Sequence, residues 1–337
     1  MTRPDERRVL GAAADAPAVG PPGPGPAASG VHRWPRPGAV APPERLAAVR
    51  ILTGGFAVAY LAVRAPVILA VRDRAPGTFS PVGVLRWLDQ PLPDAAVVAL
   101  LAAAIGAGVA FTVGAGFRVS GPLFAVAVLL LGTYRSSWGQ LLHFENLLVL
   151  HLLVLGVAAS ADAWSLDSRR RDGPPRAGHD HGAPLRLLCL VVVVSYAIAG
   201  VAKLRYGGLA WASGDTLANH IAYTATRLEL FGEAPAPLAG LAVRHAWALT
   251  PLAVASLLIE LGAPIALLGG WWRNTWVAGA WLMHLAIAAT MAIVFPFPLF
   301  LVAFAPFYEV ERVVPWLQAR QRRPAAPDLR SATRATP

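Results

Sequence analysis

The chain has 337 residues, of which 56 % are hydrophobic, and its mean hydropathy of +0.53 lies well above that of a soluble domain. Several separate apolar runs produce this value, which excludes a soluble enzyme and indicates a polytopic membrane protein. The formal net charge of +10 comes mainly from arginines in the two tails and one loop, a pattern typical of cytoplasmic segments that argues against nucleic-acid binding.

The apolar segments predict an all-α bundle of transmembrane helices. Residues 1–46 are rich in Pro, Ala, Gly and Arg, which predicts a disordered tail without a signal peptide. A membrane domain is expected over 47–313, and a disordered basic tail over 314–337. About eight segments are long enough to cross ~30 Å of hydrocarbon. They lie at about 47–71, 94–114, 119–134, 143–161, 185–203, 248–270, 275–294 and 297–313.

The arginines indicate the orientation of this bundle. An even number of spans places both tails on one side of the membrane. If that side is the cytoplasm, eighteen arginines are cytoplasmic and seven lie outside, which agrees with the positive-inside rule. We therefore expect a multi-pass plasma-membrane protein with both termini in the cytoplasm. The long outward connection at 204–247 mixes Trp and Tyr with apolar residues, which favours short interfacial helices.

The cationic residues include a single lysine, Lys203, beside 28 arginines. A guanidinium stays protonated, whereas a desolvated ammonium can lose its proton near neutral pH and act as a base. In the predicted topology His143 opens the fourth span and Lys203 closes the fifth at the same outer face. We expect Lys203 to be a base and His143 its partner. The alternatives are an interfacial anchor at Lys203 and a helix cap at His143.

Further residues at the outer helix ends are expected to bind a substrate near this pair. They are Arg135, Trp138, Asn146, Tyr196, Gly200 and Trp211. Gly200 lies three residues before Lys203 on one helix face, where it would leave room for a flat ligand against the backbone. No metal site is expected, because the chain has one cysteine and lacks the HExxH and CxxC motifs.

Four other ionisable residues fall inside predicted spans: Arg64, His151, Glu260 and His284. An unpaired charge in hydrocarbon is costly, so these side chains should face the bundle interior. We expect Glu260 to pair with Arg64. Such residues can be packing and registry devices, or they can form the path of a proton-coupled transporter.

Two motifs resemble a known family. Residues 196–204 read Y-A-I-A-G-V-A-K-L and residues 211–214 read W-A-S-G, which resembles the Y-x-x-A-G-x-x-K-L…W-x-x-G motif of the vitamin K-dependent γ-carboxylase superfamily. Its bacterial members are the horizontally transferred transmembrane (HTTM) domain proteins. Residues 138–146 and 162–167, which contain Trp, His and Asn and then W-S-L-D, are similar to the family's W…H…N run and its W-S-x-D.

The resemblance implies quinol chemistry at Lys203. In the animal enzyme the matching lysine is the base that starts vitamin K hydroquinone oxygenation, and a histidine of the preceding helix, matched here with a one-residue gap by His143, assists it. The implied cofactor is a membrane quinol such as menaquinol, with O2 and CO2, so the implied partners are the lipid bilayer and a lipophilic quinone. The family's lysine is often doubled, whereas Ala202 stands here. The animal enzyme also has a long lumenal domain after its helices, and the resemblance does not extend to that domain. For this chain we therefore expect only the quinone half of the animal enzyme's reaction. The alternatives are a non-catalytic binding or scaffold protein and a proton-coupled transporter.

Overall fold

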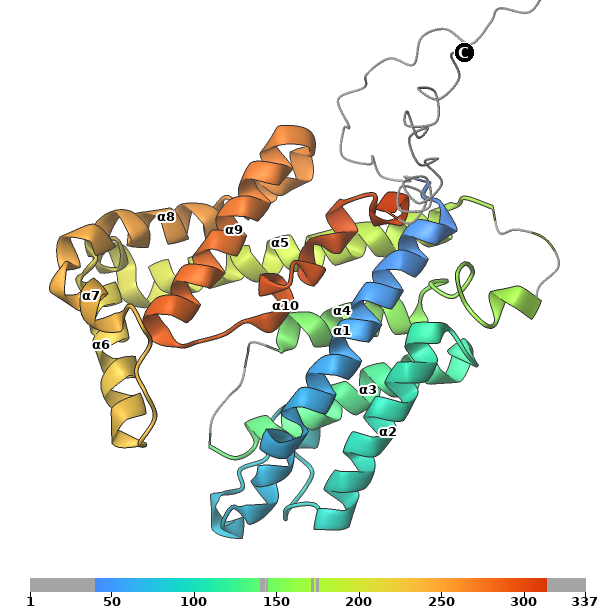
Figure 1. Ribbon diagram of the computed structural model, residues 1–337, viewed down its shortest axis with the longest axis horizontal. Helices are drawn as coiled ribbons and strands as arrows, with labels where there is room; N and C mark the ends of the chain where they lie inside the picture. The colour runs from blue at the N-terminus through green and yellow to red at the C-terminus, as the bar shows by residue number, and fades with distance from the viewer. Residues whose placement is uncertain (1–39, 140–142, 144, 171–172, 174–175, 314–337) are drawn as a thin grey trace, which may run out of the picture. The chain divides into compact units, whose positions relative to one another are not determined.

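The computed structural model describes residues 40–139, 143, 145–170, 173 and 176–313. The chain splits into two units, and the first, 1–32, lies outside the described residues. Most of the first predicted tail and all of the second lie outside them as well. The described part of the second unit consists of helices joined by turns and irregular segments, and its β-structure is an isolated antiparallel bridge between Ala41 and Gly178 (Figure 1). The predicted all-α fold is confirmed.

Four helical segments of the described chain are long and apolar enough to cross a membrane. They contain α1 (Pro43–Leu69), α2 (Asp94–Val113), α3 (Phe117–Ser136) and α5 (His179–Gly207). Three more predicted spans correspond to α4 (Asn146–Val157), α8 (Leu249–Leu261) and α9 (Gly270–Met291). Because α4 and α8 have only 12 and 13 residues, they are shorter than the segments that the apolar runs predicted.

The eighth predicted span, 297–313, is not a continuous helix. It consists of α10 (Pro296–Leu299) and two 3-10 turns at 302–307 and 310–312. The prolines in this stretch lack the backbone N–H that a continuous helix needs. Side chains of α9 bind some of its carbonyl oxygens: Trp281 donates to Leu299 at 3.0 Å and Arg273 donates to Phe307 at 2.9 Å. Irregular backbone at membrane depth needs such partners within the protein.

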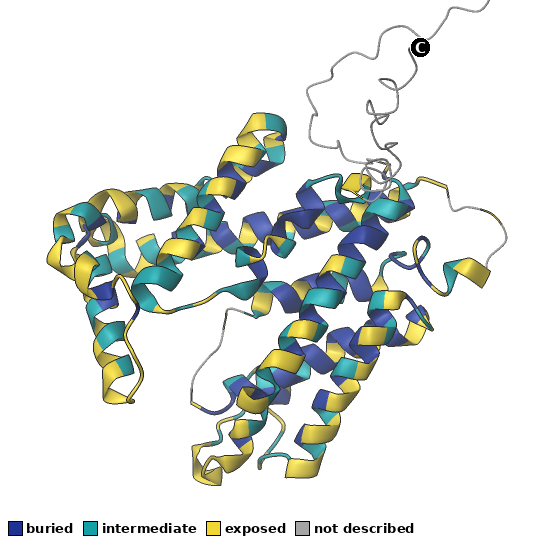
Figure 2. Cartoon of the chain, in the orientation of Figure 1, coloured by how far each residue is buried: buried dark blue, intermediate teal, exposed yellow. Residues whose placement is uncertain are grey.

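Helices α1 to α4 share the larger apolar core, and α3 and α4 meet at two glycines. A Cβ at Gly121 would overlap the carbonyl oxygen of Gly156, and a Cβ at Gly156 would lie 2.7 Å from the carbonyl oxygen of Gly121. Small residues allow this close approach, which is how helices pack in lipid. Figure 2 shows the buried residues along the facing sides of these helices.

A second core joins α5, α9 and the last segment through aromatic side chains such as Tyr196, Trp276 and Phe304. The connection after α5 forms α6 (Asp215–Leu230) and α7 (Ala239–Arg244). Helix α6 is largely exposed, and Ile221 is its buried residue (Figure 2). The 204–247 connection therefore does contain short helices, while their place at the membrane surface stays a prediction.

The W-S-x-D segment, residues 164–167, contacts two helices of the larger apolar core. The carboxylate of Asp167 accepts hydrogen bonds from the backbone N–H groups of Gly116 and Phe117 at 3.0 and 2.7 Å, so it caps the start of α3. Arg50 of α1 is fully buried and donates to the carbonyl oxygens of Ser160 and Trp164 at 2.8 and 2.7 Å. These contacts thus tie α1 and α3 to the segment that follows α4.

Candidate functional site

Lys203 lies near the end of α5, where Gly207 and Gly208 stop the helix. Its Nζ donates a hydrogen bond of 2.6 Å to Oε1 of Glu260, which comes from α8. The lysine side chain is 21 % exposed and the glutamate side chain 6 %, so the pair is buried on one side only. The 3-10 turn Gly208–Ser213 brings Trp211 back toward the lysine, with Nζ 5.0 Å from the centre of a Trp211 ring.

A second polar pair lies close by, on the same helix. Tyr196, seven residues before Lys203 on α5, shares a hydrogen bond of 2.7 Å with Nε2 of His284 from α9. Both side chains are buried, and Trp276 packs edge-on against Tyr196 with ring centres 5.0 Å apart. His284 lies within electrostatic range of Lys203, and Tyr196 within that of Glu260. The two pairs therefore form one group of ionisable side chains, which we call the lysine cluster: Lys203, Glu260, Tyr196 and His284.

Two buried polar atoms of the lysine cluster find no hydrogen-bond partner among the described residues. They are Oε2 of Glu260 and Nδ1 of His284. Nε1 of Trp211, beside the cluster, is also without a partner in this part of the chain. Unpaired buried polar atoms are uncommon in folded proteins and are often found where a protein binds a ligand, a water molecule or a proton.

Gly200 lets α8 approach α5 at this point. A Cβ at Gly200 would lie 3.0 Å from the Cβ of Glu260 and 3.0 Å from side-chain atoms of Leu261. The space beside Gly200 is therefore filled by α8. Its role in ligand binding stays a prediction, but its contact with α8 places Glu260 within reach of Lys203.

His143 is exposed, and its ring lies 5.7 Å from that of Phe295. The ring of Phe295 lies in turn 4.9 Å from that of His284, so an aromatic side chain connects His143 to the lysine cluster. Asn146 is the exposed first residue of α4, and its backbone N–H donates to the carbonyl oxygen of His143 at 3.1 Å. The predicted pairing of Lys203 with His143 stays a prediction.

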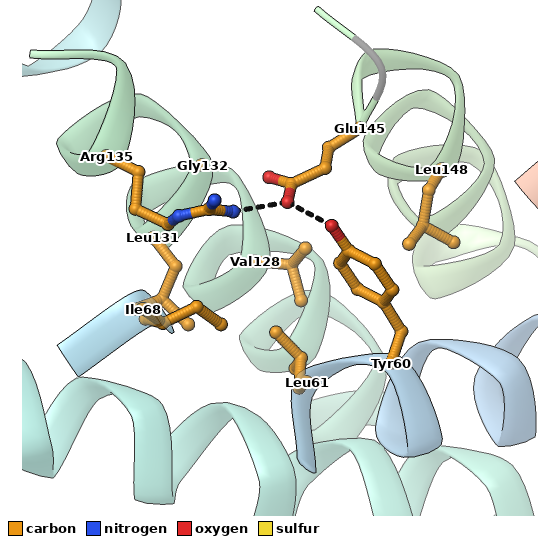
Figure 3. Close-up of a pocket in the computed structure, with 9 residues that line it drawn as sticks. All are labelled: Tyr60, Leu61, Ile68, Val128, Leu131, Gly132, Arg135, Glu145 and Leu148. Atoms are coloured by element: carbon orange, nitrogen blue, oxygen red, sulfur yellow. Dashed lines mark hydrogen bonds and ion pairs between the residues drawn. The ribbon is translucent and has the colours of Figure 1, made fainter. Parts of the chain in front are cut away.

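Arg135 and Trp138 belong to a different group of side chains. Arg135 forms a buried ion pair with Oε1 of Glu145, and the Tyr60 hydroxyl donates to the same oxygen at 2.5 Å (Figure 3). A small cavity between α1, α3 and the start of α4 is lined by these three side chains and by apolar residues (Figure 3). Trp138 is buried against Phe79, with ring centres 5.1 Å apart.

The predicted site residues thus do not meet at one place: Trp138 packs against Phe79, and His143 and Asn146 lie at the start of α4. Tyr196, Gly200 and Trp211 lie with or beside Lys203, whereas Arg135 lies in a second cluster with Glu145. The expected pairing of Glu260 with Arg64 is wrong, because Glu260 binds Lys203 and its other oxygen has no partner in the part of the chain that the structure describes. Sequence reasoning did not assign a role to Glu145.

Apolar spanning helices joined by buried ion pairs define an all-α integral membrane protein. The profile of the HTTM domain family matches residues 40–311, which is most of the chain, and the protein belongs to this family. Searches of curated proteins and of solved structures found no match.

Proposed function

We propose that this HTTM protein removes a proton from a membrane quinol at Lys203. The observation that carries the proposal is the placement of the only lysine of the chain. Its side chain is 21 % exposed, and its Nζ is bound by the buried carboxylate of Glu260. The family membership and the resemblance to the γ-carboxylase motif around 196–214 support the same role.

The surroundings of Lys203 suit a flat, weakly acidic substrate. Trp211 offers an aromatic face beside the amine. Its indole N–H, which has no partner among the described residues, can donate a hydrogen bond to an anionic oxygen. His143 is the proposed second donor, reached past Phe295. Menaquinol is the proposed quinol, with O2 and CO2 as the proposed co-reactants, and the acceptor is left open.

The proposed location is the plasma membrane, with both termini in the cytoplasm and the lysine end of α5 at the outer face. The excess of arginines in the proposed cytoplasmic segments supports this orientation. Cysteine labelling from either side of the membrane, at positions such as Tyr206 after replacement of Cys189, tests it. Labelling of Tyr206→Cys from the cytoplasmic side alone contradicts the proposed orientation.

The test of activity is quinol-dependent oxygen uptake by the purified protein in vesicles that contain menaquinol. We expect Lys203→Ala and Lys203→Arg to reduce the rate by about 100-fold or more, because neither variant offers an amine that can be deprotonated. The matched control is Arg205→Ala, which removes an exposed cation two residues further along α5. Wild-type rates in both Lys203 variants contradict the proposal.

A proton-coupled transporter is the second candidate, and the buried Glu260 on a short apolar helix favours it. Intramembrane carboxylates are common in proton pathways. This candidate predicts proton flux that Glu260→Gln abolishes while Lys203→Ala leaves it intact. Flux that depends on both residues, or quinol turnover without flux, contradicts it.

A further inference from the structure

We infer that Glu260 is the proton-exchange partner of Lys203, so that the neutral amine–carboxylic acid form of the pair is the base. This inference rests on the proposed function and adds a residue to it. Glu260 is not part of the motif around Lys203, because it lies 57 positions further along the chain. The structure alone brings the two side chains together.

The first argument is the geometry of the pair. Nζ and Oε1 are 2.6 Å apart, which is short for a hydrogen bond between nitrogen and oxygen and places a proton within reach of either atom. The contact of α8 with Gly200 holds Glu260 close to α5. Lys203 and Glu260 are therefore positioned for direct proton transfer without an intervening water molecule.

The second argument is the solvation of the carboxylate. Glu260 is almost completely buried, and only one of its two oxygens has a hydrogen-bond partner among the described residues. Burial disfavours a carboxylate, and a missing hydrogen bond removes part of what would stabilise it. Both effects bring the neutral form of the pair closer in free energy to the ionic form.

The resulting step is balanced without an oxidant or a reductant. A proton moves from Nζ of Lys203 to Oε1 of Glu260, which leaves an amine with a free electron pair and a carboxylic acid. The amine then takes the proton of a quinol hydroxyl, and the electrons of the broken O–H bond stay on the quinol oxygen. The site now holds an ammonium, a carboxylic acid and a quinol anion, and the anion lies beside the ammonium that stabilises it.

Charged and titratable groups around Lys203 come from three elements. Glu260 faces it from α8, and His284 from α9 lies within electrostatic range. Tyr196 precedes it on α5, and Arg205 follows it there with its guanidinium over the ring of Tyr206. Glu260 makes the direct contact, so its removal should change the proton affinity of the amine more than removal of Arg205.

The single lysine permits a direct test that needs no substrate. An amine-reactive ester modifies only unprotonated amines, so the rate at which it labels the peptide containing Lys203 can be followed by mass spectrometry across a pH series. The full-length protein is used in detergent micelles, and its folded state is checked by gel filtration. We expect Glu260→Gln to lower the midpoint pH of labelling by about one unit or more, because the ammonium loses its anionic partner.

Two further variants keep the test decisive. Glu260→Asp restores the carboxylate and should bring the midpoint back toward that of the wild type, which a merely structural effect of Glu260→Gln would not do. Gly200→Ala displaces Glu260 and should lower the midpoint pH by less than Glu260→Gln does. If Glu260→Gln does not fold, Gly200→Ala takes its place in the test. The matched control, Arg205→Ala, should raise the midpoint slightly, if it moves it at all. A midpoint unchanged in Glu260→Gln, or in Gly200→Ala if it stands in, overturns the inference.

The labelling test can fail independently of the proposed function. If the midpoint moves as expected but Lys203→Ala keeps full quinol turnover, the shared proton is real and the proposed reaction is wrong. If turnover depends on Lys203 but the midpoint does not respond to Glu260, the lysine works alone and the inference is wrong.

Discussion

Two buried glutamates in this protein each bind a cation, and they differ in what the cation can do. Glu145, at the start of α4, binds Arg135 of α3, and the same oxygen also accepts a hydrogen bond from Tyr60 of α1. Glu260 of α8 binds Lys203 of α5 through one oxygen, and its other oxygen is unpaired among the described residues. A guanidinium does not release its proton in a protein, whereas an ammonium does so when it is desolvated.

Under the proposed function, the arginine pair is structural and the lysine pair takes part in the chemistry. Around Glu145 three helices meet, and two donors on one oxygen stabilise a permanent charge. Around Glu260 the partner is an ammonium, and the lysine side chain is 21 % exposed. We therefore expect disruption of the arginine pair to reduce stability most, and disruption of the lysine pair to reduce activity most.

The largest effect on stability is expected for Glu145→Gln. This change leaves the buried guanidinium of Arg135 without its anion, and breaking such a pair costs about 3–5 kcal/mol. The melting temperature of the purified protein in detergent should fall strongly. Glu260→Gln should lower it much less, because Lys203 can respond by releasing its proton. Glu229→Gln, at an exposed position on α6, is the control that should leave stability unchanged. Equal losses in the first two variants would remove the distinction.

Exchange of the two cations tests the same comparison through activity. Lys203→Arg keeps a positive charge beside Glu260 and should leave a folded protein whose quinol turnover is lower by about 100-fold. Arg135→Lys should retain most of the turnover and lose stability, because an ammonium replaces a guanidinium in a buried pair. Turnover is measured in vesicles and stability by thermal unfolding. The opposite pattern would show that the roles of the pairs are reversed.

Substitutions at two glycines distinguish a role in helix packing from a role in positioning Glu260. Gly121→Ala forces α3 away from α4 and should cost about 1–3 kcal/mol of stability, because its Cβ would overlap the backbone of Gly156. Gly200→Ala meets the Cβ of Glu260 at 3.0 Å and should reduce turnover more than stability. Gly106→Ala is the control, because nothing lies within 4 Å of its Cβ. A change in Gly200→Ala that affects stability alone would separate Gly200 from the lysine site.

The smallest effect is expected at the start of α3. Asp167→Ala removes a cap from two backbone N–H groups and should destabilise the protein by about 1 kcal/mol. Turnover of the folded protein should not change, because the hydrogen bonds of Asp167 to Gly116 and Phe117 lie at the start of α3. Asp167→Asn, which keeps one acceptor oxygen, should lose less. A selective loss of turnover in Asp167→Ala would show that the region around the start of α3 also takes part in the reaction.

The sequence predicted the helices where apolar residues run on without proline, as in α1 and α2. The broken path at 296–312 was predicted as part of one span because hydropathy stays high there, although its prolines remove backbone donors. Lys203 was found because a lysine is rare in this chain. The pairing with Glu260 was missed because helix packing brings together positions that are distant in sequence. An unpaired glutamate in hydrocarbon is costly, so the sequence indicated that Glu260 needs a cationic partner. It did not indicate which cation that is.

The broken last segment has a consequence for motion within the membrane. Its carbonyl oxygens are bound by Arg273 and Trp281 of α9, and its first part contributes Phe295, whose ring lies against His284 of the same helix. Sliding of α9 alone would leave those carbonyl oxygens bare in a lipid environment, at several kcal/mol each. We therefore expect α9 and the terminal segment to keep these contacts and to move together as one unit in the membrane.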